Sequence, residues 1–186
     1  MNKIIVTFSG FHGVGKSTIS KYISEKYGLK RVSSGELFRI MAKKRGVSLE
    51  ELSRMAERDY EIDKYIDEYM KRECSKGGCV GDGLLSGWIL KDVADIKIWL
   101  KSPLPIRIRR IADREGRNYN EVYRETLLRE ESEIRRFKKI YGIDVLDLSI
   151  YDYVIDTSKI SLKGLYKIID LIFEEYINLR CQSQNE

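Results

Sequence analysis

Hydrophobic residues in this chain form short continuous runs, and these runs alternate with stretches in which apolar residues recur at helical spacing. The runs predict strands at residues 3–9, 29–32, 79–82, 95–100 and 151–156. Residues 16–27 are typical of the intervening helices, because Ile19, Ile23 and Tyr27 fall on one face. Strands that alternate with helices indicate a parallel sheet covered on both faces. We therefore predict an α/β fold of three layers with a five-stranded parallel sheet.

Helix boundaries follow from capping signals. Ser33 and Ser48 each stand three residues before a glutamate, which is the spacing of a capping box. They predict helices that end near residues 45 and 58, and a longer apolar-striped helix follows through residue 70. Ser102 followed by Pro103 predicts an N-cap with proline in the first helical position. A charged helix is expected at about 118–139, and Ser161 is expected to cap a final one.

Length and composition favour one domain. A chain of 186 residues that is 42% hydrophobic can bury a sizeable core. Its apolar runs are far shorter than the roughly 20 residues of a membrane span, so we expect no membrane partner. The first strand begins almost at once and leaves no room for a secretory signal, so we expect a cytoplasmic protein.

The cysteines are Cys74, Cys79 and Cys181, an odd number. Cys74 and Cys79 lack a second pair with metal-binding spacing. We therefore expect reduced thiols and not a zinc site.

Positive charge is concentrated in one segment of a chain whose formal net charge is +5. Residues 103–139 hold eleven Lys and Arg against seven Asp and Glu. Such a segment can be a nucleic-acid surface or a set of arginines gathered around phosphates. Acids are interleaved with the arginines, whereas a surface that binds a polyanion is normally more one-sided. We favour the second interpretation and expect no nucleic-acid partner.

A phosphate-binding loop follows the first predicted strand and leads directly into a helix. Its sequence has the form G-x-x-x-x-G-K-S. The glycines let backbone N–H groups turn toward phosphate oxygens, and the helix N-terminus adds its dipole. Lys16 is placed to reach the β- and γ-phosphates, and the Ser17 hydroxyl suits Mg²⁺. We expect the His12 side chain to face solvent. The predicted ATP-binding residues are Gly10, Phe11, His12, Gly13, Val14, Gly15, Lys16, Ser17 and Thr18.

Other polar residues follow the strands that should end at the same edge of the sheet, where ligands of such folds collect. Arg39 can hold an acceptor phosphate through its planar guanidinium, or it can be a solvated helix residue. Asp82 can hold water molecules on magnesium, or it can form a turn before Gly83. A small kinase needs a residue that holds the acceptor phosphate and an acid that holds magnesium. It also needs arginines that close over the phosphates. Candidates flank residues 115–121: Arg107, Arg110, Arg114, Arg117, Arg129, Arg135 and Arg136. Surface ion pairs on a charged helix are the alternative.

Several blocks of sequence together resemble the P-loop nucleoside monophosphate kinases, and most closely the cytidylate kinases of the archaeal type. The resemblance covers nearly the whole chain. It rests on residues 10–18, 33–39, 82–83 with 87–88, 95–101, 129–136, 141–144 and 149–158. Generic phosphate-loop proteins do not share the last three blocks.

The resemblance implies a P-loop NTPase fold with a core (residues 1–32, 78–114 and 150–180), a helical acceptor-binding insert (33–77) and a helical lid (about 115–140). It implies transfer of a phosphoryl group from ATP to CMP or dCMP with Mg²⁺. Nucleotides would be the partners, and we expect a monomer. One alternative function is a kinase whose acceptor is AMP, UMP or shikimate. A further alternative is an ATP-switched module that binds RNA or protein.

The resemblance also implies roles for individual residues. Related cytidylate kinases carry an arginine, an acid and a second arginine at the spacing of Arg129, Glu133 and Arg136. In those kinases the first arginine and the acid bind cytosine, and the second arginine contacts the phosphates. Glu133 stands where bacterial-type relatives carry Asp. The implied catalytic residues are Lys16, Arg129 and Arg136. The implied acceptor-binding residues are Ser34, Arg39, Asp82, Arg129 and Glu133. The implied magnesium residues are Ser17 and, through water, Asp82.

One position departs from the family pattern. After Asp82-Gly83 the family usually carries an arginine that binds the acceptor phosphate, and this chain has Leu84. Lys91 or Lys43 can replace that contact. Otherwise we expect weaker acceptor affinity or a shifted acceptor preference, because a charged hydrogen bond is worth about 1.5–3 kcal/mol.

Overall fold

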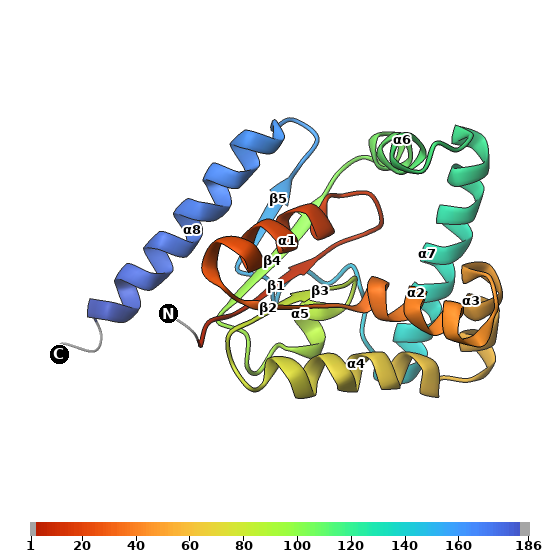
Figure 1. Cartoon of the computed structure of the whole chain (residues 1–186), viewed down its shortest axis with the longest axis horizontal. Coiled ribbons are helices and arrows are strands. Elements are labelled where there is room, and N and C mark those ends of the chain that lie inside the picture. The colour runs from red at the N-terminus through yellow and green to blue at the C-terminus, as the bar shows by residue number, and fades with distance from the viewer. Residues whose placement is uncertain (1–2, 183–186) are drawn as a thin grey trace.

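The computed structural model describes residues 3–182. Its centre is one parallel sheet of five strands in the order β2-β3-β1-β4-β5 (Figure 1). The strands are β1 (Ile5–Ser9), β2 (Lys30–Ser33), β3 (Cys79–Asp82), β4 (Ile96–Lys101) and β5 (Tyr153–Asp156). Asp82 pairs in register with Phe8 on one side and Ser33 on the other. The carboxyl ends of β1, β2 and β3 therefore meet at one edge.

Helices cover both faces of the sheet, which confirms the predicted three layers. Side chains alternate along β1, as strand geometry requires. Val6 and Phe8 point to a core shared with α1 (Lys16–Tyr27) and α8 (Leu162–Gln182). Ile5 points to the other face, where α4 (Glu61–Cys74) and the short α5 (Ser86–Ile89) pack.

Two helical segments extend from the carboxyl edge of the sheet. The first, which we call the insert, contains α2 (Ser34–Arg45), α3 (Leu49–Arg58) and α4, and has its own core around Phe38, Leu52 and Ile62. The second contains α6 (Leu104–Glu115) and α7 (Tyr119–Tyr141). In Figure 1, α7 runs down the right-hand side from α6 to the insert, and it contacts both α6 and α3. None of the helices in residues 3–182 is long and apolar enough to cross a lipid bilayer.

Three of the four predicted helix caps form and one does not. The Ser161 hydroxyl accepts a hydrogen bond from the Gly164 N–H at 3.1 Å. At Ser48 the capping box is complete, with reciprocal hydrogen bonds to Glu51 of 3.1 and 2.8 Å. The Ser33 hydroxyl accepts a hydrogen bond from the first turn of α2. The prediction that Ser102 caps α6 is wrong, because Pro103 occupies the N-cap and the helix begins one residue later. The Pro103 carbonyl instead accepts the first intrahelical hydrogen bonds.

The prediction of reduced thiols is wrong for two of the three cysteines. Cys74 and Cys79 form a disulfide, with their Cα atoms 5.0 Å apart. The turn that joins α4 to β3 contains Gly77 and Gly78, both with positive φ, and it brings the two buried cysteines into one cluster. The spacing of the cysteines in the sequence could not show that these two side chains meet. Cys181 is free and exposed.

Candidate active site

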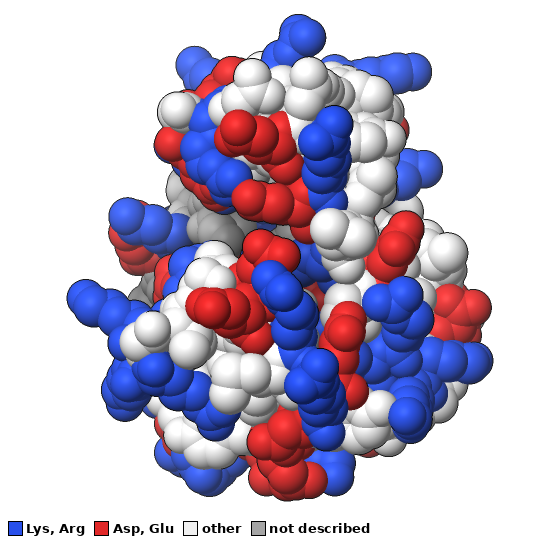
Figure 2. Space-filling model, turned by 90° about the vertical axis from the view of Figure 1, so that its right-hand side faces the viewer, with Lys and Arg blue, Asp and Glu red and all other residues white. Residues whose placement is uncertain are grey.

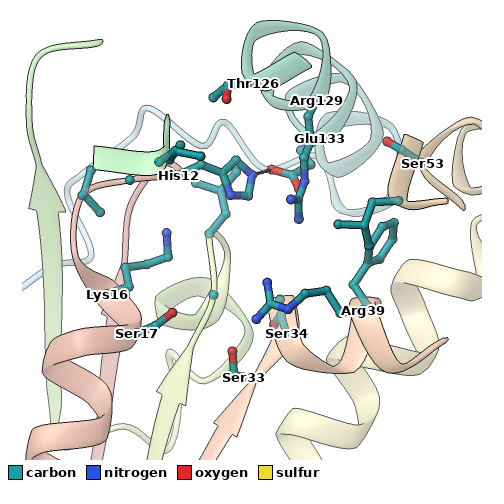
Figure 3. A pocket seen from close by; sticks show the side chains of 18 of the residues that line it. His12, Lys16, Ser17, Ser33, Ser34, Arg39, Ser53, Thr126, Arg129 and Glu133 are labelled. Atoms are coloured by element: carbon teal, nitrogen blue, oxygen red, sulfur yellow. Dashed lines mark hydrogen bonds and ion pairs between the residues drawn. The ribbon is translucent and has the colours of Figure 1, made fainter. Parts of the chain in front are cut away.

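A cavity of about 940 Å³ lies at the carboxyl edge of the sheet, between the loop after β1, the insert and α7. Figure 3 shows side chains from these elements converging on it. Gly10 and Phe11 do not line the cavity, and the Phe11 ring packs against Trp99. The other predicted site residues do: His12, Gly13, Val14, Gly15, Lys16, Ser17, Thr18, Ser34, Arg39, Asp82, Arg129, Glu133 and Arg136.

The phosphate loop requires glycine at specific points. Gly10 and Gly13 have φ of 136° and 80°, values that residues with a Cβ rarely adopt. A Cβ at Gly10 would collide with the Leu100 carbonyl, and one at Gly13 with the Arg107 carbonyl. The loop can therefore wrap tightly, with its N–H groups available to an anion.

Lys16 holds the loop closed from the start of α1. Its ammonium donates hydrogen bonds to the carbonyl oxygens of Gly10 at 2.5 Å and Phe11 at 2.8 Å. Burial lowers the pKa of Lys16 to about 8, and the carboxylates of Asp82, Glu133 and Glu130 oppose this shift. A phosphate group beside the ammonium would favour its charged form.

Asp82 is buried and held by residues that the sequence did not single out. Its Oδ2 accepts hydrogen bonds from Arg31 Nη2 at 2.7 Å and from Ser20 Oγ at 3.0 Å. Arg31 also pairs with Glu36 at 2.7 Å, so that glutamate does not return to the α2 cap. Ser20 lies one helical turn after Ser17, and its hydroxyl is 3.2 Å from the Ser17 carbonyl oxygen. Helical spacing could have pointed to Ser20.

Arg39 is a cation without a carboxylate partner in residues 3–182, where its guanidinium forms no ion pair. It extends into the cavity from α2, beside Ser34 and opposite Lys16 (Figure 3). Burial lowers its pKa, and the nearby charges of Arg129 and Arg114 act in the same direction. An unpaired, partly buried guanidinium is a site for an anion.

The other arginines divide into two groups. Arg110 lines the cavity and donates to the Thr157 hydroxyl and carbonyl at 2.9 and 2.8 Å. The other candidate arginines form ion pairs with acids, which was the alternative to a role in closing over the phosphates. The paired arginines are Arg107, Arg114, Arg117, Arg129, Arg135 and Arg136. On the face shown in Figure 2, positive and negative side chains are interspersed and do not form a surface of one sign.

His12 does not face solvent, contrary to the prediction. Its Nε2 lies 2.9 Å from Glu133 Oε2, and the imidazole turns from the loop toward α7 (Figure 3). Glu133 Oε1 accepts a hydrogen bond from Arg129 Nε at 3.1 Å. Burial lowers the pKa of His12. Burial would raise the pKa of Glu133, but the charges of His12 and Arg129 outweigh it and hold that pKa well below its usual value.

Arg136 lies in a polar cluster between α4 and α7. It forms a buried two-point ion pair with Asp63, with N–O distances of 2.6 and 3.3 Å, and it donates to the Ser132 hydroxyl at 2.6 Å. Burial raises the pKa of Asp63 despite Arg136. Burial also raises the pKa of Asp67, one turn further along α4, to about 7, although it accepts a hydrogen bond from Tyr141.

The sequence analysis missed Asp63 and Asp67. Both line the cavity. They stand four residues apart in α4, next to Ile62 and Ile66 of its apolar stripe. Two acids four residues apart, each next to an apolar residue of the buried stripe, could have indicated that these carboxylates are buried.

Leu84 fills apolar space at the edge of the cavity. It is 7% exposed and packs in one cluster with Leu85, Trp99 and Phe137. Neither of the lysines proposed as replacements lines the cavity. A missing arginine contact at this position is therefore not supplied by Lys43 or Lys91.

We expect Leu84→Arg to destabilise the fold instead of restoring a phosphate contact. The new charge would replace an apolar side chain that is buried in this cluster. The free energy of unfolding should therefore fall by about 3 kcal/mol. Leu84→Met keeps the volume and should cost less than about 1.5 kcal/mol. Chemical denaturation measures both. Undiminished stability combined with a lower acceptor KM would contradict this prediction.

The fold is the one that P-loop kinases of small molecules have. Solved structures with this fold include a gluconokinase from Sinorhizobium meliloti (TM-score 0.61, 13% identity, covering 98% of each chain) and a shikimate kinase from Acinetobacter baumannii (TM-score 0.57, 16% identity, covering 93% of this chain and 94% of that one). The model of the cytidylate kinase-like family matches residues 5–159. The chain belongs to that family.

Curated relatives agree over almost the full chain. A cytidylate kinase from Pyrococcus horikoshii is 44% identical over 168 residues, which cover 90% of this chain and 87% of the relative. A cytidylate kinase from Staphylothermus marinus is 42% identical over 174 residues, which cover 94% of this chain and 98% of the relative.

Proposed function

We propose that this protein is an ATP-dependent nucleoside monophosphate kinase that transfers the γ-phosphoryl group of ATP to CMP. Its similarity to cytidylate kinases over nearly the whole chain supports this activity. The observation in the site that carries the proposal is Arg39, whose guanidinium lines the same cavity as the phosphate loop and forms no ion pair with the described residues. Two positively charged positions in one cavity suit two ligands that both carry phosphate.

The donor would bind on the phosphate loop. Lys16 would turn from the carbonyls of Gly10 and Phe11 to the β- and γ-phosphates. Arg110 lines the cavity, forms no ion pair within residues 3–182, and adds positive charge on the α6 side. Charge stabilisation of this kind, and not covalent chemistry, is what phosphoryl transfer requires of a protein.

Magnesium would reach the site together with ATP. The Ser17 hydroxyl and the Asp82 carboxylate both line the cavity and are the hard oxygen donors that Mg²⁺ prefers. Residues 3–182 hold no group of three or more His, Cys, Asp or Glu side chains placed to bind a metal ion. This donor set fits Mg²⁺, which usually keeps several waters and binds through substrate phosphates with one or two protein ligands. When bound, the ion would neutralise charge on the β- and γ-phosphates.

The acceptor would lie between α2, α4 and α7. Arg39 would hold its phosphate, beside Ser34 and Arg129. We assign Arg136 to the base and not to a phosphate, because Asp63 already holds its guanidinium in the insert. An aspartate accepts a hydrogen bond from the exocyclic amine of cytosine, and the guanidinium can donate to the neighbouring ring acceptors.

The reaction then needs no general base. An oxygen of the acceptor phosphate, already ionised at neutral pH, attacks the γ-phosphorus. The bond from that phosphorus to the oxygen shared with the β-phosphate breaks, and ADP and CDP form. Lys16 and Arg129 would stabilise the charge that moves between the two phosphates.

A panel of acceptors tests this function. ADP release is measured in a coupled assay with CMP, dCMP, UMP, AMP and shikimate. We expect CMP to have the highest kcat/KM, exceeding UMP by at least about tenfold because the two bases present opposite hydrogen-bonding groups to Asp63. Binding of ATP without any acceptor-dependent ADP release would contradict the proposal.

A further inference from the structure

His12 connects the phosphate loop to α7 through its side chain. It is the only histidine of the chain, and its side chain is 23% exposed. Whether neutral or charged, an imidazole binds a carboxylate by donating an N–H hydrogen bond. Nε2 therefore carries the hydrogen and donates it to Glu133.

The backbone of His12 is held by the same part of the molecule. Its N–H donates to Glu130 Oε1 at 3.0 Å, and its carbonyl accepts from Arg107 Nη1 at 2.9 Å. Arg107 and Glu130 form a buried ion pair with each other. The loop at His12 is thus bonded to α7 through both its side chain and its backbone.

The contacts continue from Glu133 to the insert. Glu133 holds Arg129 at 3.1 Å, and the Arg129 guanidinium lies over the Phe38 ring, 5.7 Å from its centroid. Phe38 directly precedes Arg39 in α2. An unbroken series of contacts therefore leads from the loop that would bind the donor to the helix that would bind the acceptor.

We propose that His12 is a positioning residue that couples the two nucleotide sites. Through His12, the loop that would bind the triphosphate holds Glu133, and Glu133 holds Arg129 in the cavity on the acceptor side. Since coupling between two binding sites is reciprocal, each nucleotide increases the affinity for the other by the same factor. This inference rests on the proposed function.

Calorimetry on the full chain tests the coupling. The Kd for CMP is measured alone and with a saturating non-hydrolysable ATP analogue, for the wild type, His12→Phe and His12→Gln. In the wild type we expect the analogue to tighten CMP binding by about tenfold. His12→Phe keeps a ring without the donor, so the tightening should fall below about twofold. His12→Gln keeps an N–H donor and should recover most of it.

Affinity for the analogue without CMP serves as the control, because it reports whether the loop is intact. It is determined separately for each variant, so that a loss of donor affinity is not counted as a loss of coupling. Full tightening in His12→Phe, no tightening in the wild type, or equal loss in both variants overturns the inference and leaves the kinase activity in place. Absence of CMP binding to the wild type under every condition would instead overturn the proposed function.

Discussion

Lys16→Met is expected to lower kcat by about 10²–10³-fold, the usual loss when a preorganised donor to developing charge is removed. The ammonium of Lys16 is held at the phosphate loop by two carbonyl oxygens, where it is ready to bind a triphosphate. Methionine fills a similar volume but cannot stabilise the charge on the transferring group. Steady-state ADP formation with CMP as acceptor measures the effect.

Lys21→Met is the matched control on the same helix. Its side chain is 71% exposed, and its ammonium lies 3.8 Å from Glu25 in a surface pair. Such pairs contribute about 0–1 kcal/mol, so both kcat and the melting temperature should stay close to those of the wild type. Turnover by Lys16→Met within about threefold of the wild type would remove the phosphate loop from the mechanism.

Asp63→Asn is expected to reduce the preference for CMP over UMP by about 10- to 100-fold in kcat/KM. The Asp63 carboxylate can only accept hydrogen bonds, which suits the exocyclic amine of cytosine. The asparagine amide also donates, and can therefore bind the O4 of uracil. The change leaves Arg136 buried without its anion, so stability should also fall, by about 3–5 kcal/mol.

A second acid–arginine pair between the insert and α7 provides the control. Glu57 and Arg135 lie 3.4 Å apart, but both side chains are exposed. Glu57→Gln should leave the CMP to UMP ratio within about twofold of the wild type, because solvent already screens this pair. ATP affinity, measured for both variants below their melting temperatures, checks that the core is folded. An unchanged ratio in folded Asp63→Asn would show that the base is bound elsewhere.

The local backbone structure around the phosphate loop could be predicted from residues that are neighbours along the chain. A buried strand, a glycine-rich turn and a helix are consecutive at residues 5–27, and the steric demands of Gly10 and Gly13 act within that segment. The complete capping box at Ser48 likewise involves residues three apart. The parallel sheet followed from alternating periodicity, since parallel strands need a crossover between them.

Contacts between distant segments were not predictable in this way. Residues 73 positions apart form the Asp63–Arg136 pair, and 121 positions separate His12 from Glu133. Both depend on how α7 packs against the insert and the loop. In the sequence Arg136 is one of several arginines in a charged helix, and nothing local distinguishes a surface ion pair from a buried one.

By itself, the sequence determined the order of strands and helices, the phosphate loop and the polar residues at the strand ends, because each depends on neighbours along the chain. Tertiary structure alone decided that Cys74 meets Cys79, that Leu84 is buried, that His12 turns inward and that Arg39 has no ion-pair partner among residues 3–182. Burial and ion pairing depend on which surfaces meet when helices pack, and that is a property of the assembled fold.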